Sequence, residues 1–195
     1  MTSIRIHAAA GHYAELGQMI VSFQTIEATV KHFLLLLIAH QQPSETSLTR
    51  VALSELSFAA LLRVGESTLD IFNLEWLEST QGLADKMSNN DHAVSLEYIK
   101  SGLKLARSVE VRRNQLIHSD WNPLSGVPAP PGAILRTKAR KRGKPNEIKI
   151  EVETIESISG VSNDAQKASE LLALGFRGIL KLQIATSAAS RLGAA

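Results

Sequence analysis

The chain has 195 residues, of which 44% are hydrophobic and 21% are charged, and its formal net charge is +2. This composition supports a sizeable core and excludes wholesale disorder. The chain contains no cysteine, which excludes disulfides, cysteine-based zinc sites and thiol chemistry. Its most apolar run, residues 33–39, is far shorter than the roughly 20 residues that span a bilayer. We therefore expect a cytoplasmic protein without membrane contact.

Apolar residues recur at intervals of three and four along much of the chain, a pattern typical of amphipathic helices. The pattern predicts one short helical piece near Trp76 and four long helices, at about residues 11–40, 58–72, 91–118 and 164–190. We expect Ser57, the polar run 88–91 and either Ser162 or Asn163 to begin three of these helices, because such residues cap helix N-termini. Residues 41–47 are expected to form a loop.

Two segments of alternating apolar and charged residues follow the helix predicted at 91–118. Residues 133–140 and 147–155 are the predicted strands of a hairpin with one apolar and one charged face. Gly175 and Gly178 in the last helix leave room for another helix to approach closely. The sequence thus predicts a single all-α domain over residues 1–195, with four to five helices and a β-hairpin insertion at about 122–156.

The hairpin carries an unbalanced positive charge. Residues 121–146 contain no Asp or Glu, and their basic side chains are Arg136, Lys138, Arg140, Lys141, Arg142 and Lys144. Six cations on one projection can follow a phosphate backbone, which makes RNA a candidate partner. The alternative is a solvated face on which the strand cations pair with Glu151 and Glu153, leaving the turn cations uncompensated.

Two charged residues lie where the helical pattern calls for apolar ones. Glu27 falls on the apolar stripe of the first long helix, and Arg113 falls on that of the helix at 91–118. A buried guanidinium is very unfavourable without an acidic partner or an anionic ligand. Glu27 is the first candidate partner of Arg113, and Glu110 is the competitor. Alternatively, Glu27 reaches a hydrated edge of its own stripe.

The segment Arg113-Asn114-Gln115-Leu116-Ile117-His118 brings a cation, an amide and an imidazole to the end of that helix. Asn114 and His118 are neighbours at i and i+4, and the long Arg113 side chain can swing towards the imidazole. A titratable histidine beside a fixed cation suits metal-free RNA cleavage, because the imidazole can move protons while the guanidinium stabilises the phosphorane. Alternatively, His118 is a helix-terminal cation or a hydrogen-bonded core residue.

The sequence lacks the motifs of metal sites, nucleotide-binding sites and serine hydrolases. The six histidines lack the spacing of a helical metal-ligand pair, and no acidic cluster accompanies them. No P-loop, dinucleotide-binding glycine pattern or nucleophile elbow is present. We therefore expect neither a cofactor nor a metal ion.

The RNQLIH segment at 113–118 resembles the R-x4-6-H motif of HEPN domains, and the resemblance covers about residues 11–121 and, more loosely, the last helix. It implies a HEPN-like bundle that forms a homodimer and brings two motifs into one composite active site. Many such proteins are metal-independent endoribonucleases of toxin–antitoxin or defence systems. The resemblance thus implies RNA and a protein antitoxin as partners.

The resemblance also implies roles for individual residues. Arg113 is expected to stabilise the phosphate, Asn114 to position groups, and His118 to act as general acid and base. From the helical stripes we expect Glu27 to support Arg113. From their charge, and not from the resemblance, the residues expected to contact substrate are Arg112, Arg140, Lys141, Arg142 and Lys144. Two alternatives stay open: a non-catalytic HEPN-like module that binds RNA, a nucleotide or a protein, and a purely structural motif.

Overall fold

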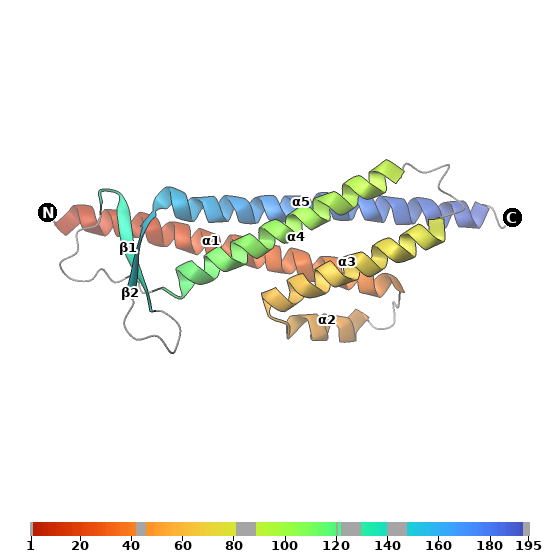
Figure 1. Ribbon diagram of the computed structural model, residues 1–195, viewed down its shortest axis with the longest axis horizontal. Helices are drawn as coiled ribbons and strands as arrows, with labels where there is room; N and C mark the ends of the chain where they lie inside the picture. Colours follow the sequence, from red (N-terminus) through yellow and green to blue (C-terminus); the bar gives the residue numbers. More distant parts are fainter. Residues whose placement is uncertain are drawn as a thin grey trace. The chain divides into compact units, whose positions relative to one another are not determined.

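The computed structural model describes residues 2–41, 46–80, 89–119, 121, 130–139 and 148–192 (Figure 1). Within them, five helices and two strands follow in the order α1 (Thr2–Gln41), α2 (Thr46–Ser54), α3 (Phe58–Thr80), α4 (Asn89–Ile117), β1 (Ala133–Ala139), β2 (Ile148–Thr154) and α5 (Ile155–Leu192). The fold is an all-α bundle with a β-hairpin before the last helix, as predicted. No helix in this part of the chain is long and apolar enough to cross a membrane.

The chain divides into two compact units, and each is described by itself. The hairpin unit comprises Met1–Gln24 and Ser108–Ala165, and the bundle unit comprises Thr25–Arg107 and Gln166–Ala195. Helices α1, α4 and α5 contribute residues to both units. The single domain expected over residues 1–195 therefore stays a prediction.

Two helices begin where capping residues predict. The Ser57 hydroxyl accepts a hydrogen bond from the backbone N–H of Ala60 at 3.3 Å, which makes Ser57 the N-cap of α3. Helix α4 begins at Asn89, inside the predicted polar run. Helix α3 extends to Thr80, so the short piece expected near Trp76 is its C-terminal part.

The predicted start of the last helix is wrong. Helix α5 begins at Ile155, and Ser162 lies buried within it. Thr154 and Ser157 form a reciprocal cap, because each hydroxyl accepts a hydrogen bond from the other residue's backbone N–H at 3.2 Å. This pair caps the helix about two turns before Ser162 and Asn163, the residues that the sequence favoured.

Helix α2 was not predicted. It overlaps the expected loop at 41–47, of which residues 42–45 lie outside the described part of the chain. Among its apolar side chains, Leu53 is buried, whereas Leu48 and Val51 are 73% and 62% exposed. A helix of nine residues with so little buried surface leaves a weak periodic pattern, because too few turns repeat it.

In the bundle unit, glycines bring α4 and α5 into close contact. A Cβ atom on Gly175 would lie 2.6 Å from both the Ser95 carbonyl oxygen and Ile99 Cγ1, and one on Gly178 would overlap the Ser95 side chain. The close approach predicted from the two glycines is confirmed. Nearby, the rings of Phe33 and Phe176 meet edge to face at 5.8 Å, which joins α1 to α5.

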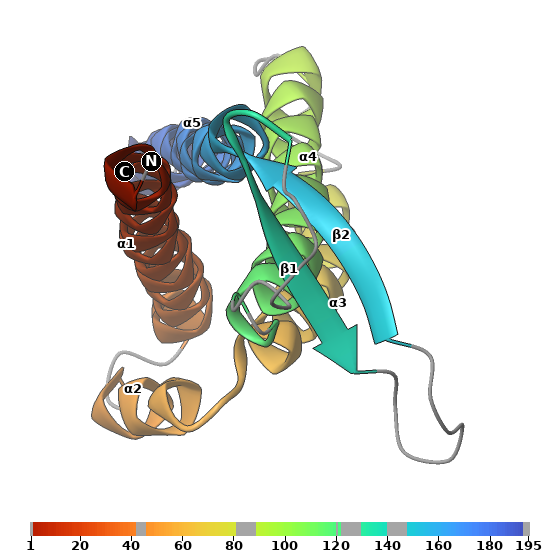
Figure 2. The same ribbon diagram turned by 90° about the vertical axis from the view of Figure 1, so that its left-hand side faces the viewer.

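In the hairpin unit, a tight turn leads into β1. The backbone N–H of Ala133 donates to the Pro130 carbonyl at 3.1 Å, and Gly132 adopts a φ of 73°. Proline followed by a glycine with positive φ is typical of a type II turn. Strands β1 and β2 are antiparallel, with Arg136 opposite Glu151, and Figure 2 shows them side by side. The two predicted strands are confirmed, while their connection at 140–147 is outside the described residues.

Replacing Gly175 with alanine tests the contact between α4 and α5. The new methyl group would meet a backbone oxygen that cannot rotate away, and overpacking of this kind costs about 1–3 kcal/mol. This outweighs the gain of about 1 kcal/mol in helix propensity. We expect Gly175→Ala to lower the free energy of unfolding, measured by urea denaturation.

Gly17→Ala is the matched control, since Gly17 is exposed on α1 and a Cβ there would meet nothing within 4 Å. This variant should gain about 0.5–1 kcal/mol of stability from helix propensity. Equal stabilisation by both substitutions would contradict the close packing at Gly175.

Candidate functional site

The predicted site residues lie at the C-terminal end of α4, in the hairpin unit. Arg113 and Asn114 are half-buried in the last turns of the helix, and His118 is exposed in the turn that follows Ile117. The backbone N–H of His118 donates to the Asn114 carbonyl at 3.2 Å, so the helical i, i+4 relation between these residues is kept. The interpretation of His118 as a core residue is wrong, because its side chain is exposed.

Arg113 is held by an aromatic ring and an amide. Its guanidinium carbon lies 4.8 Å from the centroid of the Phe23 ring on α1, a cation–π distance. Its Nη1 donates a hydrogen bond of 2.8 Å to Asn114 Oδ1. Its Nε is buried and has no hydrogen-bond partner within the described residues. The guanidinium is thus oriented while part of its donor capacity stays unused.

The charge of Arg113 has no carboxylate partner within the described part of the hairpin unit, so the alternative pairing with Glu110 is wrong. Glu27 belongs to the bundle unit, where its carboxylate accepts a hydrogen bond of 2.7 Å from Lys31 Nζ. Its pairing with Arg113 stays a prediction. A half-buried cation without a counter-ion in its own unit favours binding of an anion.

A buried ion cluster of Arg112, Arg136, Glu151 and Glu153 lies beside this end of α4. The Arg136 Nε donates to Glu153 Oε1 at 2.6 Å, and Arg136 also pairs with Glu151. Arg112 Nη2 approaches Glu153 Oε2 at 2.5 Å. The two positive and two negative charges balance, which offsets part of the cost of removing them from water.

Part of the hairpin's charged face points inward, although Leu135 on the opposite face is buried as well. Arg136 and Glu153 are 1% and 2% exposed, whereas Ile150 and Val152 on the other face are 43% and 52% exposed. The expected pairing of strand cations with Glu151 and Glu153 is confirmed for Arg136. The prediction that this face is solvated is wrong for Arg136 and Glu153, which are buried. Side chains and carbonyl groups at the end of α4 compensate the charges of these two residues, which apolar neighbours could not do.

Glu153 is ionised at neutral pH. Burial raises the pKa of its carboxyl, but hydrogen bonds from Ser157, Arg136 and Arg112 and the charge of Arg112 outweigh this effect. The pKa of Glu153 therefore lies below its usual value. The Ser157 hydroxyl donates to Glu153 Oε2 at 2.7 Å, which also connects the cluster to the first turn of α5.

The last carbonyl groups of α4 are capped by side chains other than His118. Arg136 Nη1 donates to the Gln115 carbonyl at 3.3 Å and to Ser119 Oγ at 3.0 Å. Ser119 Oγ in turn donates to the Gln115 carbonyl at 2.5 Å, and Trp121 Nε1 donates to the Leu116 carbonyl at 2.9 Å. The capping of these carbonyls is thus explained without the imidazole of His118, which is exposed.

The predicted substrate contacts fall into two groups. Arg112 is half-buried, and its guanidinium is engaged by Glu153, so contact of Arg112 with substrate stays a prediction. The other predicted contacts lie outside the described residues: Arg140, Lys141, Arg142 and Lys144.

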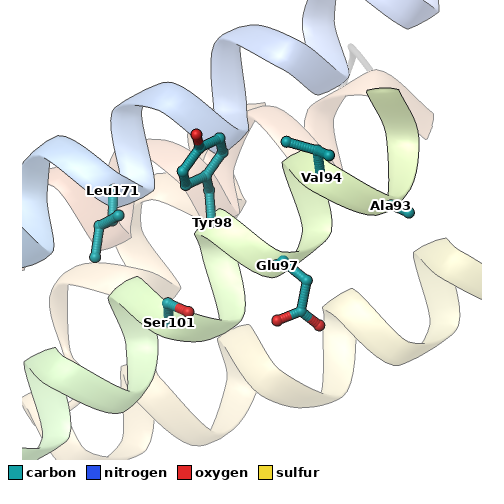
Figure 3. A pocket seen from close by; sticks show the side chains of 6 residues that line it. All are labelled: Ala93, Val94, Glu97, Tyr98, Ser101 and Leu171. Carbon is teal, nitrogen blue, oxygen red and sulfur yellow. The ribbon is translucent and has the colours of Figure 1, made fainter. Parts of the chain in front are cut away.

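His118 does not line either of two surface grooves in the described part of the chain. One, in the hairpin unit, has a volume of about 460 Å³ and is lined by residues that include Arg112, Ser157 and Asp164. The other, in the bundle unit, has a volume of about 360 Å³, and Figure 3 shows Tyr98 and Leu171 beside it. Within the described residues, no three His, Asp or Glu side chains are grouped to hold a metal ion.

Replacing Glu153 with glutamine tests the buried ion cluster. At neutral pH we expect Glu153→Gln to cost about 3 kcal/mol of unfolding free energy, because it leaves only Glu151 to balance the charges of Arg112 and Arg136. Since the folded-state pKa of Glu153 is lowered, its contribution is present at neutral pH and is lost as pH falls into the acidic range. The difference from the wild type should therefore shrink in acid.

Glu66→Gln is the control, because it breaks an exposed ion pair. The side chains of Glu66 and its partner Arg107 are 45% and 46% exposed. An exposed pair contributes less than about 1 kcal/mol. If Glu153→Gln were as mild as this control at neutral pH, the cluster would not hold the hairpin unit together.

Comparison of the chain with protein-family models, curated proteins and solved structures found no match in any of the three. The likeness to HEPN domains therefore rests on the RNQLIH segment alone.

Proposed function

We propose that the chain is a metal-independent endoribonuclease of HEPN type that acts as a homodimer with a composite active site. The observation that carries the proposal is the state of Arg113. Its guanidinium is oriented by Phe23 and Asn114 and lacks a carboxylate partner among the described residues of its unit. It is five residues from the exposed His118, at the same helix end. A phosphodiester supplies the anion that such a cation favours.

The proposed reaction is attack of the RNA 2′-hydroxyl on the adjacent phosphorus. A neutral His118 accepts the proton of the hydroxyl while the new bond from oxygen to phosphorus forms. The bond from phosphorus to the 5′-oxygen then breaks, and this oxygen takes up a proton. The products are a 2′,3′-cyclic phosphate and a free 5′-hydroxyl. Arg113 stabilises the extra negative charge that the phosphorane carries between the two steps.

A dimer fits this chemistry because the reaction needs a base for the 2′-hydroxyl and an acid for the leaving 5′-oxygen. One chain supplies one RNQLIH segment, and the histidine of a second copy can protonate the leaving oxygen. RNA is thus the proposed substrate, and a protein antitoxin or a defence system is the setting that the family resemblance implies. The cations at 140–144 are proposed to hold the RNA backbone.

His118→Ala tests the proposal directly. We expect the purified wild type to cleave RNA in buffer with excess EDTA, and we expect His118→Ala to lose at least about 100-fold in rate, the scale of acid–base catalysis. Because His118 is exposed, its removal should leave the melting temperature almost unchanged. Cleavage is measured on a labelled oligonucleotide, and the cyclic phosphate is identified by mass spectrometry.

His32→Ala is the control, since the side chain of His32 on α1 is also exposed. Full cleavage by both variants would contradict the assignment. If the wild type binds RNA but never cleaves it, the non-catalytic binding module replaces the nuclease. Substitution of the cations at 140–144 would then weaken binding and reduce its salt dependence.

A further inference from the structure

We propose that Arg136 on the hairpin is a positioning residue for His118, so that the β-hairpin belongs to the catalytic apparatus and is not an appendage to it. The role of Arg136 in catalysis rests on the proposed nuclease function. The central claim of the inference, that one guanidinium fixes the turn containing His118, can be tested without any nuclease activity.

The contacts of Arg136 lie on both sides of His118 in the sequence. Its Nη1 donates to the Gln115 carbonyl in the last turn of α4, at 3.3 Å. The same nitrogen donates to the hydroxyl of Ser119, the residue after His118, at 3.0 Å. The hydroxyl itself donates to the Gln115 carbonyl, which closes a small ring of hydrogen bonds around the turn. The backbone of His118 is therefore held between two anchored residues.

Arg136 is itself fixed on its other side. Its Nε donates to Glu153, and Glu151 forms an ion pair with its guanidinium. Arg136 is 1% exposed, so this arrangement is shielded from water. Because the guanidinium is planar, the nitrogen that contacts the turn and the nitrogens that contact the carboxylates move as one rigid group. Through Arg136, the position of the strands therefore fixes the position of the turn.

A positioning residue is needed here because His118 lies beyond the last helical residue, Ile117. An exposed side chain on a turn has more freedom than one within a helix, and catalysis is sensitive to displacement of about 1 Å. Arg136 and Ser119 cap the helix end in its place, so the imidazole stays available for proton transfer.

The experiment is amide hydrogen exchange by NMR on the full chain. In wild type, the His118 amide donates to the Asn114 carbonyl and should exchange slowly. In Arg136→Met we expect the amides of residues 116–119 to exchange about tenfold faster, while amides of the bundle unit such as Leu103 keep their rates. Unchanged exchange at 116–119 would overturn the proposal. Equal acceleration at every amide would overturn it too, since the role would then be purely structural.

Two further variants keep the test decisive if Arg136→Met folds poorly. Ser119→Ala removes one anchor of the turn and leaves the ion cluster in place, so it should accelerate exchange at 116–119 in the same way but less strongly. Arg107→Met is the control, because Arg107 is also on α4 and its ion pair with Glu66 of α3 is exposed. It should leave exchange at 116–119 unchanged, and a Ser119→Ala variant indistinguishable from it would overturn the proposal.

RNA cleavage gives the functional readout. In Ser119→Ala and Arg136→Lys we expect kcat to fall by about tenfold to 100-fold with little change in KM, because the RNA still binds while the imidazole is misplaced. Arg136→Lys keeps the charge and one donor nitrogen, so it should retain more activity than Arg136→Met. Altered exchange with unchanged kcat would overturn the positioning role. A wild type that never cleaves RNA would instead defeat the nuclease function, with the exchange result still deciding whether Arg136 fixes the turn.

Discussion

The ion pair between Arg136 and Glu153 is the interaction on which the arrangement of the hairpin unit depends. A two-stranded hairpin is marginally stable by itself, so this one needs an anchor outside its own strands. The anchor is charged, and both of its residues are almost fully buried. Arg112 and Ser157 also bind Glu153, and Glu151 also binds Arg136. Removing charges from water is costly, and only a balanced and fully hydrogen-bonded set recovers that cost. The same cluster joins the strands, the end of α4 and the start of α5.

Much of the fold could be predicted because its signals are local and repetitive. The long helices, the two strands and the close packing at Gly175 follow from apolar spacing, alternation and glycine placement. The start of α5 was missed because the Thr154 and Ser157 cap lacks the usual acidic partner, and the later Ser162 and Asn163 offered a conventional alternative. The inward face of the hairpin was missed for a different reason. Alternation separates two faces, but it does not reveal which face meets a helix end rich in carbonyl groups.

Only the local part of the candidate site could be predicted from the sequence. Helical geometry groups Arg113, Asn114 and His118, and the structure shows a side-chain hydrogen bond between Arg113 and Asn114 and a backbone hydrogen bond between His118 and Asn114. The sequence could not reveal that Phe23 orients the Arg113 guanidinium, because contacts between distant segments produce no pattern in the local spacing of residues. The part played by Arg136 was equally invisible, because an arginine in a basic hairpin is expected to face water. In the structure Arg136 caps α4, a role that the sequence also offered to His118, and the imidazole of His118 is exposed.

The central claim is that Arg113 is an oriented cation prepared for the phosphate of RNA. NMR of the arginine Nε–H groups tests it most directly, during titration with a 2′-O-methyl RNA oligonucleotide that lacks the attacking hydroxyl. The Arg113 signal should shift saturably, because its Nε has no partner among the described residues and its guanidinium has no carboxylate in its unit. Arg63, exposed on α3, serves as the internal reference and should not shift. An Arg113 signal that stays unchanged at saturating oligonucleotide would contradict the account.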